Sequence, residues 1–405
     1  MGKIKCNLAK EKSQPTTNKN GLSLSDGTTT INVILTLNEP VILGTQIGDQ
    51  NTVASQDHVA GGKLLGMMAQ DYISRHGVDD DFTEIFLSGA LSFGFLTKDA
   101  SFPAPLNIQY DKYDKKQIFD IYADDLQGKI TKPLAMQITE QGEIIKVDKT
   151  SSFHTRRENR TAGSSLKEDG AAYYYESVDK GQVFHGKISG EADSIKKLVD
   201  KMGAQISGHL GLSKSSRYGH VSLQLSEDRA DEKLEARDSY YAALLTPAIL
   251  LDSHAQCSPT ASAFAAALGL GESDVTEAYA RTCPIYSYNT QWRSRTTKYT
   301  AMKDGSAFII NNYHGDKKTI LIGEQTDKGY GMVRFYTPEE MKELKNEIKT
   351  SRAATNQSSP PISDLPDGAP VLLKNIKSNN DDQMKELKVK KQALADLNSL
   401  SLIHI

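Results

Sequence analysis

The sequence has few of the residues that build disulfide frameworks and metal sites. It contains three cysteines among 405 residues, Cys6, Cys257 and Cys283, and no Cys-x-x-Cys pair. A His-Glu-x-x-His motif and a Gly-x-x-x-x-Gly-Lys-Ser/Thr phosphate loop are both missing. These absences argue against a secreted disulfide scaffold, a structural zinc site and a Walker-type nucleotide site, and they fit a reducing cytoplasm.

The sequence also has no long apolar run and no strong excess of either charge. The apolar run ALLTPAILL (243–251) is far shorter than the ~20 residues that a membrane-spanning helix needs. The first twenty residues are polar, so we expect neither a signal peptide nor a membrane anchor. Because the formal net charge is −3, binding to a nucleic acid would depend on local clusters of lysine and arginine.

Two stretches of the chain look like diverged copies of one unit. The first runs from ILTLNEPVILG (34–44) to GLSKSSRYGHVSL (211–223), and the second from ALLTPAILLD (243–252) to IGEQTDKGYGMVRF (322–335). Each copy opens with an apolar strand that breaks at a proline and closes with a glycine-framed loop ending in Tyr-Gly-x-Val. A repeat of this length predicts two related domains rather than a solenoid.

The order of patterns inside the first copy indicates an α+β module. Apolar residues at helical spacing over 62–74 follow the opening strand, and an amphipathic helix over 191–203 precedes the glycine loop. Between them, residues 171–190 form two strand-like runs about the turn at Lys180 and Gly181. Strand, helix, strands, helix and strand in this order predict a βαββαβ-like module.

The second copy offers the same kinds of element. A helix is expected over 261–271, a strand over 306–313, and a closing helix over 337–349 that Thr337 would cap. We therefore predict a βαββαβ-like module here as well. The expected regions of the chain are a flexible arm (1–30), a first module with an insertion (31–230), a second module (231–350), and a linker with a C-terminal helix (351–405).

The last six residues, LSLIHI (400–405), match a common transposon-based sequencing adapter read as protein. We expect them to be an artefact and leave them out of the fold prediction. The true C-terminus would then be missing.

The first glycine loop has the composition of an anion-binding site. Glycines at both ends permit positive φ angles, so that successive backbone N–H groups can converge on a phosphate. Side-chain donors and charges within the loop come from Ser213, Lys214, Ser215, Arg217 and Tyr218, between Gly211 and Gly219. The alternative is a hairpin loop that needs glycines for its backbone alone. The second loop contains Glu324 and Asp327, which would repel phosphate, so we expect it to be structural.

Two further clusters combine cations with aromatic residues. HTRRENR (154–160) supplies His154, Arg156, Arg157 and Arg160, and arginine suits RNA because it both pairs with phosphate and stacks on bases. YNTQWRSRTTKYT (288–300) interleaves aromatic side chains with cations, as single-strand binders do. The alternatives are a solvated surface loop for the first cluster and a core tryptophan for the second.

The loop after the first strand carries acid and base candidates. IGDQNTVASQDHVAGG (47–62) contains Asp49, Asp57 and His58, and a loop carboxylate could bind a divalent metal that assists RNA cleavage. The alternative is an ordinary turn aspartate. The second copy has SHAQCSPTAS (253–262) at the matching place, with no carboxylate after Asp252. We therefore expect Asp49 to be dispensable, and the nine histidines show no metal-ligand spacing.

These features, taken in order, resemble the RAMP superfamily of CRISPR effector proteins. ILTLNEPVILG (34–44) is similar to the family's first strand, HVAGGKLLGMM (58–68) to its entry into the first helix, and GLSKSSRYGHV (211–221) to its glycine loop. The run 161–190 followed by that loop resembles the two-module RAMP subunit of type III-D systems. Ala60 and Gly62 depart from the family's usual proline and serine, but Gly61 and Gly62 would still let the backbone turn tightly before the helix.

The resemblance implies two ferredoxin-like, RRM-type modules and a prokaryotic antiviral function. The chain would be a cytoplasmic subunit that holds the repeat-derived 5′ end of a CRISPR guide RNA, beside a large polymerase-like subunit and backbone RAMP subunits. We add His58 and Lys63 of the helix-entry segment to the RNA-binding candidates. A non-catalytic role without cofactors is expected. The alternatives are a RAMP subunit that cleaves target RNA with Mg²⁺ at Asp49, and a scaffold that contacts protein only.

Overall fold

The computed structural model describes residues 22, 24–44, 52–155, 172–213, 217–228, 233–286, 288–289 and 294–355. Most of the predicted arm, the C-terminal helix and residues 400–405 lie outside the described residues. None of the helices in the described part of the chain combines the length and the hydrophobicity that crossing a bilayer requires.

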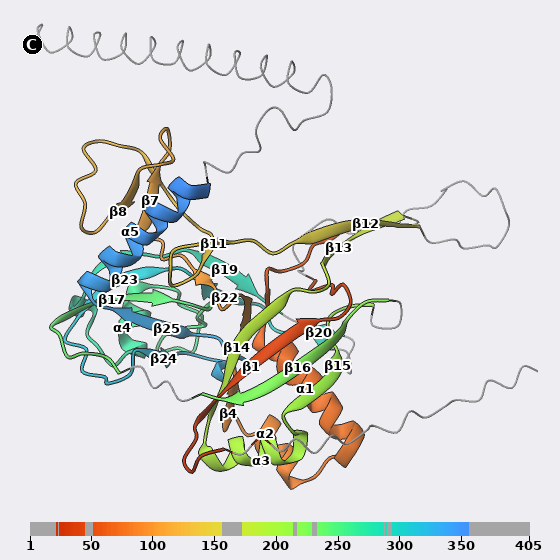
Figure 1. Cartoon of the computed structure of the whole chain (residues 1–405). Helices are drawn as coiled ribbons and strands as arrows, with labels where there is room; N and C mark the ends of the chain where they lie inside the picture. Colours follow the sequence, from red (N-terminus) through yellow and green to blue (C-terminus); the bar gives the residue numbers. More distant parts are fainter. Residues whose placement is uncertain are drawn as a thin grey trace, which may run out of the picture. The chain divides into compact units, whose positions relative to one another are not determined.

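The first module is a ferredoxin-like βαββαβ unit (Figure 1). Its elements in chain order are β1 (Thr30–Leu37), α1 (Gly61–His76), β4 (Leu91–Phe93), β14 (Val183–Gly190), α3 (Ala192–Met202) and β16 (His220–Glu227). The strands lie in the order β16–β1–β14–β4, and every neighbouring pair is antiparallel. The sheet is extended by β15 (Gln205–His209) beside β16, and by β5 (Leu96–Lys98) and β3 (His58–Val59) beside β14. The predicted order of elements is therefore confirmed for this module.

Alternation along β1 explains which face of this sheet is covered. Ile31, Val33, Leu35 and Leu37 are fully buried, whereas the residues between them are only partly buried. Successive strand residues point to opposite faces, so one face of β1 packs into the core. That core includes the apolar stripes of α1, α3 and the short helix α2 (Asp80–Phe86).

The second module repeats the strand order but lacks one helix. Its elements are β17 (Ser239–Leu244), α4 (Ala261–Ala267), a 3₁₀ turn η1 (Glu272–Asp274), β18 (Val275–Tyr279), β23 (Ala307–Asn311), β24 (Thr319–Leu321), a second turn η2 (Thr326–Lys328) and β25 (Met332–Tyr336). The sheet order is β18–β23–β17–β25–β24. Only the short connection Asn312–Lys318 joins β23 to β24, so the second βαββαβ prediction is wrong for its second helix.

One face of this second sheet is covered by a helix at the end of the second module and by the insertion of the first module. The helix α5 (Pro338–Thr355) begins as predicted, because the Glu340 amide donates to Thr337 Oγ1 at 3.2 Å and the Thr337 amide to Glu340 Oε2 at 2.9 Å. Buried residues of β17, α5 and the insertion form one apolar cluster. The insertion contributes the short strands β6 (Phe102–Pro103), β7 (Ile108–Asp111), β8 (Ile118–Asp120), β9 (Thr131–Pro133), β10 (Gln137–Ile138) and β11 (Ile144–Ile145).

Each module also extends a two-stranded hairpin ahead of its third strand. In the first module it is formed by β12 (Lys149–Thr155) and β13 (Ala172–Val178), with β2 (Thr52–Val53) parallel to β13. In the second it is formed by β19 (Thr282–Ile285) and β22 (Tyr299–Met302), with β20 (Tyr288–Asn289) and β21 (Ser294–Arg295) beyond them. The two hairpins contain the two predicted cation-rich clusters, although Arg156, Arg157, Arg160 and Trp292 lie outside the described residues.

Candidate nucleic-acid interface

The two copies share one junction between the proline-broken strand and the glycine loop. In the first module, the Gly219 amide donates to Pro40 O at 2.9 Å and the Leu212 amide to Ile42 O at 3.0 Å. In the second, the Gly331 amide donates to Pro247 O at 2.8 Å and the Glu324 amide to Ile249 O at 2.9 Å. The predicted repeat is therefore visible as the same set of backbone hydrogen bonds.

The backbone alone requires glycine at several of these positions. Gly219 has a φ angle of 95°, and a Cβ atom there would lie 2.5 Å from Leu210 O. Gly331 has a φ angle of 77°, and its Cβ would strike Ile322 O. Such contacts exclude any side chain. The structural alternative therefore explains these glycines without a ligand.

The rest of the first loop is only partly described. Gly211 also has positive φ, as do Ser213 and Arg217, and Arg217 is exposed. Left-handed residues of this kind turn backbone N–H groups toward one side, as anion-binding loops do. Lys214 and Ser215 lie outside the described residues, so phosphate binding by this loop stays a prediction.

The second loop packs against the start of α1. A Cβ atom on Gly61 would overlap both Phe93 O and Lys328 O, and Ser92 Oγ donates to Thr326 O at 2.5 Å. Gly61 is therefore needed for a close approach between the modules rather than for the tight turn that we expected. The loop connects the two modules, which agrees with the structural role predicted for it.

Aromatic side chains cover both faces of the β12–β13 hairpin. Phe153 and Tyr174 lie opposite each other with ring centroids 5.0 Å apart, and they are 53% and 49% exposed. On the other face, His154 stacks on Tyr173 at 5.3 Å. The His154 ring also lies 6.5 Å from the ring of Tyr218 in the glycine loop. Two sequence candidates from separate clusters, His154 and Tyr218, are thus brought together.

One nitrogen of the His154 ring lacks a hydrogen bond to any described residue. Its Nε2 atom is buried and has no hydrogen-bond partner among the described residues. A buried polar atom normally has a partner. We therefore define the hairpin–loop junction as the β12–β13 hairpin together with the glycine loop 211–219.

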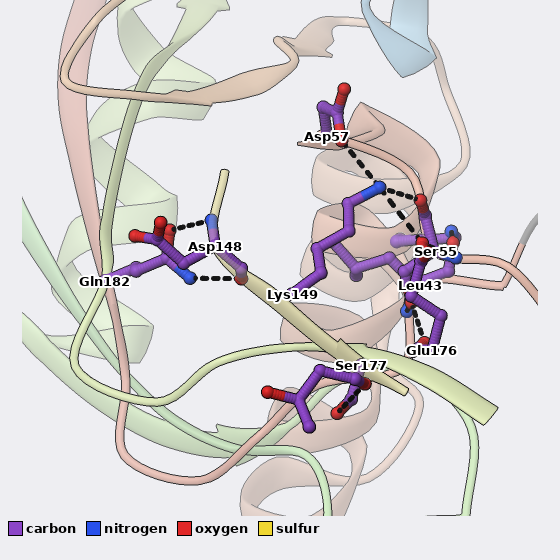
Figure 2. A network of polar contacts seen from close by, with 10 residues as sticks. Leu43, Ser55, Asp57, Asp148, Lys149, Glu176, Ser177 and Gln182 are labelled. Atoms are coloured by element: carbon purple, nitrogen blue, oxygen red, sulfur yellow. Dashed lines mark hydrogen bonds and ion pairs between the residues drawn. The ribbon is translucent and has the colours of Figure 1, made fainter. Parts of the chain in front are cut away.

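A charged network fixes the base of this hairpin (Figure 2). Lys149 Nζ lies 2.6 Å from Asp57 Oδ1 and 3.1 Å from Glu176 Oε1, and the Ser55 amide donates to the same Glu176 oxygen at 3.0 Å. Ser55 Oγ in turn accepts from the Leu43 amide at 3.0 Å. Burial opposes the charge of Lys149, but hydrogen bonds to Asp57 and Glu176 outweigh burial and raise its pKa.

This network assigns Asp57 a structural contact. Its carboxylate pairs with Lys149 and ties the helix-entry loop to the hairpin. Asp49, the other carboxylate considered for a metal, lies outside the described residues. Within the described ranges, no three histidine, cysteine, aspartate or glutamate side chains gather as a metal site would require.

The two helix-entry candidates, His58 and Lys63, are engaged inside the protein. Burial and the nearby Lys63 charge lower the pKa of His58 to about 4, and its ring stacks on Phe95 at 5.0 Å. Burial lowers the pKa of Lys63 to about 8, and Lys63 Nζ donates to Leu43 O at 3.1 Å and Gln56 Oε1 at 2.9 Å. His58 is therefore uncharged at neutral pH, and Lys63 holds the loop before α1.

A cleft of about 1100 Å³ opens beside the helix-free face of the first sheet. It is lined by polar residues of β1 and β14 and by residues of β24 and β25. Two of its three lysine and arginine side chains are paired with carboxylates, Lys187 with Asp228 at 2.5 Å and Arg334 with Glu140 at 2.8 Å. The third, Lys317, lines the cleft together with the carboxylates of Asp99 and Asp304. The cleft is therefore a poorer place for a phosphate chain than the hairpin–loop junction.

No protein-family profile and no curated protein matches the chain. Solved structures do resemble it. A chain of the type III-B Cmr-beta complex bound to cognate target RNA and AMPPnP shares 14% identity over 69% of this chain and 86% of that one, with a TM-score of 0.42.

Two further structures are similar at the same low level. A chain of the Csm3–Csm4 subcomplex of the type III-A interference complex shares 13% identity over 76% of this chain and all of that one, with a TM-score of 0.39. Oligomeric Cmr4 from Pyrococcus furiosus shares 13% identity over 49% of this chain and 99% of its own, with a TM-score of 0.28. Because these scores are low, we base the function on the geometry of this chain.

Proposed function

We propose that this chain is a guide-RNA-binding subunit of a type III, III-D-like, RNA-guided effector complex in antiviral defence. In this proposal it holds the repeat-derived 5′ end of the guide at the hairpin–loop junction. Its partners would be the guide RNA, a large polymerase-like subunit and backbone RAMP subunits. The family-like motifs at 34–44, 58–68 and 211–221 support this assignment, together with the paired ferredoxin-like sheets.

The observation that carries the proposal is the meeting of His154 and Tyr218. The two residues lie in clusters that the sequence separates by more than fifty positions, and each cluster has a composition that suits RNA binding. Their rings lie 6.5 Å apart, and His154 Nε2 is buried without a hydrogen-bond partner among the described residues. A single strand of RNA crossing this point would meet aromatic faces and the glycine loop together.

Different residues of the hairpin–loop junction would contact the bases and the phosphates of the RNA. Phe153 and Tyr174 expose ring faces on which unpaired bases can stack, and stacking is worth about 1–3 kcal/mol per base. Arg217 and the cations predicted at 154–160 and Lys214 would neutralise phosphates. Lys149, Asp57 and Glu176 would hold the hairpin at a fixed angle to α1. No step of this binding needs a metal or a cofactor.

The test is the identity of the RNA that copurifies with the tagged full-length chain from its host. We expect RNAs that share one repeat-derived 5′ end, and we expect His154→Ala to reduce their yield. His76→Ala is the matched control, because His76 also packs against a tyrosine ring, that of Tyr72 at 4.9 Å. RNA with random 5′ ends, or equal yields from both variants, would contradict the proposal.

A further inference from the structure

The turn between β7 and β8 gathers exposed lysines at one end of the insertion. Lys112, Lys115 and Lys116 lie within the turn, and all three are exposed. Lys129 reaches the same turn from the chain before β9, where its Nζ atom donates to Gln117 Oε1 at 2.5 Å. The Lys112 amide donates to Ile130 O at 2.8 Å, which holds the two segments side by side.

Two aromatic rings accompany these lysines. Tyr113 is 60% exposed at the turn, with Lys112 Nζ 5.5 Å from its ring centroid. Lys129 Nζ lies 4.7 Å from the ring centroid of Phe119 on β8. Tyr113 is thus the exposed ring and Phe119 a half-buried one. Cations interleaved with aromatic rings are the composition that single-strand binders use.

None of these four lysines forms an ion pair with a carboxylate in the described part of the chain. Many other lysines of the chain pair with an aspartate or glutamate, among them Lys98, Lys149, Lys187, Lys197, Lys201, Lys318 and Lys345. Among the described residues, no carboxylate lies within 4.0 Å of the ammonium group of Lys112, Lys115, Lys116 or Lys129.

The two carboxylates of the turn accept hydrogen bonds from its own donors. Asp111 Oδ1 accepts from the Tyr113 amide at 2.7 Å and from the Asp114 amide at 3.1 Å. Asp114 accepts from the Lys116 amide at 3.2 Å and from Gln117 Nε2 at 2.8 Å. These bonds fix the shape of the turn and do not involve the lysine ammonium groups.

The turn stands on a rigid base. Met341, Leu344 and Ile348 of α5 pack into the same apolar cluster as Ile108 and Ile118, which lie on the strands that the turn connects. Lys345 of α5 also pairs with Asp124 at 2.8 Å. A ligand would therefore meet the turn in a fixed position, which lowers the entropy lost on binding.

We propose that this lysine–tyrosine turn, residues 112–117 with Lys129, is a second binding site for single-stranded RNA. The lysines would contact phosphates and Tyr113 would stack on an unpaired base. The site lies in the insertion, outside the hairpin–loop junction. This proposal rests on the proposed function in one respect, which is that the chain binds RNA. A longer RNA would then be held at two places.

The test measures the affinity of the full-length chain for a fluorescein-labelled oligouridylate across a range of salt concentrations. One variant carries Lys112→Gln, Lys115→Gln, Lys116→Gln and Lys129→Gln. The control carries Lys180→Gln, Lys196→Gln, Lys342→Gln and Lys349→Gln, which are equally exposed lysines on other elements. We expect the first variant to bind about tenfold more weakly, with a salt slope lower by about 0.7 for each lost phosphate contact. The control should change the affinity by less than about twofold.

Two single variants separate stacking from charge. Tyr113→Phe should keep the affinity of the wild type, whereas Tyr113→Ala should weaken it by about fivefold or more through the lost stacking. Equal affinities of Tyr113→Ala and the wild type would overturn the stacking part of the site.

The outcomes distinguish this site from the hairpin–loop junction. If His154→Ala weakens binding but the two lysine variants behave alike, the second site is wrong and the proposed function stands. If the wild type binds no oligouridylate even at low salt, both proposals are wrong. Vesicles containing phosphatidylserine form the last arm. If the lysine-turn variant loses vesicle binding but keeps RNA binding, the turn is a membrane surface and the RNA site is overturned.

Discussion

At the residue scale, the helix-entry segment shows that the place of a residue in a motif does not reveal how its side chain packs. His58 and Lys63 were predicted to contact RNA from their place in the motif, and the sequence could not reveal that both are largely buried. His58 stacks on Phe95, and Lys63 donates to Leu43 O and Gln56 Oε1. Burial depends on residues far away in the chain, such as Phe95, so local spacing alone cannot predict it.

His58 makes the stability of the first module depend on pH. Its pKa is about 4 in the folded chain and near 6.5 when exposed, because burial and the Lys63 charge disfavour the protonated ring. Between these values the unfolded chain binds the extra proton, so the free energy of unfolding falls as the pH falls from 6.5 to 4. We expect a loss of roughly 2 kcal/mol from this group, allowing for partial exposure of its ring.

Urea denaturation of the wild type and of His58→Gln at pH 7.5 and pH 5 checks this expectation. His58→Gln should show a smaller loss of stability between the two pH values than the wild type. An identical loss in both proteins would mean that other groups control the acid sensitivity.

At the scale of elements, the repeat in the sequence predicted most of the strands and helices. The order of strands and helices along the first module, the α1, α3 and α5 helices and the cap at Thr337 follow from apolar periodicity and turn residues. The missing helix of the second module did not follow from the repeat, because the short connection Asn312–Lys318 replaces it. The strands of the insertion were not predicted, because they are too short to produce a periodic signal.

Two glycines with similar φ angles test whether the close contact at Gly331 constrains the fold. Gly331→Ala forces a Cβ atom against Ile322 O at a positive φ angle, whereas Gly203→Ala meets open space at nearly the same φ, 76° against 77°. Gly203→Ala should cost about 1 kcal/mol from its φ angle alone. Gly331→Ala should cost at least about 2 kcal/mol more, because the backbone must move to relieve the overlap.

Denaturant unfolding of both variants measures this difference. Equal destabilisation by the two substitutions would show that the close contact with Ile322 O is not a constraint on the folded chain.

The network around Lys149 predicts that removing the charge of Glu176 weakens RNA binding, which is the opposite of what charge alone would predict. Glu176→Gln removes a negative charge near the proposed RNA path, which by charge alone should strengthen RNA binding. However, Glu176 also orients Lys149 and the Ser55 amide at the base of the hairpin. We expect Glu176→Gln to weaken oligouridylate binding about threefold, because the aromatic faces lose their fixed position.

Glu84→Gln is the control for that measurement. Glu84 pairs with Lys197 at 2.6 Å and likewise lies on the first module, but it joins α2 to α3. Tighter binding by Glu176→Gln than by Glu84→Gln would show that the network acts by charge and not by position.

At the scale of the whole molecule, affinity for RNA must come from local clusters because the net charge is −3. The aromatic side chains on both faces of the β12–β13 hairpin were not among the predicted site residues, apart from His154. The run Tyr173-Tyr174-Tyr175 could have indicated them, because successive residues of a strand point to opposite faces. The proximity of His154 to Tyr218 could not be predicted, because it depends on how the hairpin and the glycine loop pack.

The two glycine loops should contribute unequally to RNA binding. We expect the isolated chain to bind RNA weakly and with strong salt dependence. Charge reversal at Lys214 and Arg217 in the first loop should reduce retention of guide RNA more than reversal of Lys328, whose loop packs against α1. Equal effects, measured as RNA retained by the purified complex, would remove the first loop from the proposed site.

The most direct measurement is photo-crosslinking of guide RNA that carries 4-thiouridine in its repeat-derived 5′ part, followed by identification of the crosslinked peptides. The account predicts crosslinks within the β12–β13 hairpin or the loop 211–219 of the first module. Crosslinks confined to the second module, or to other subunits of the complex alone, would contradict it.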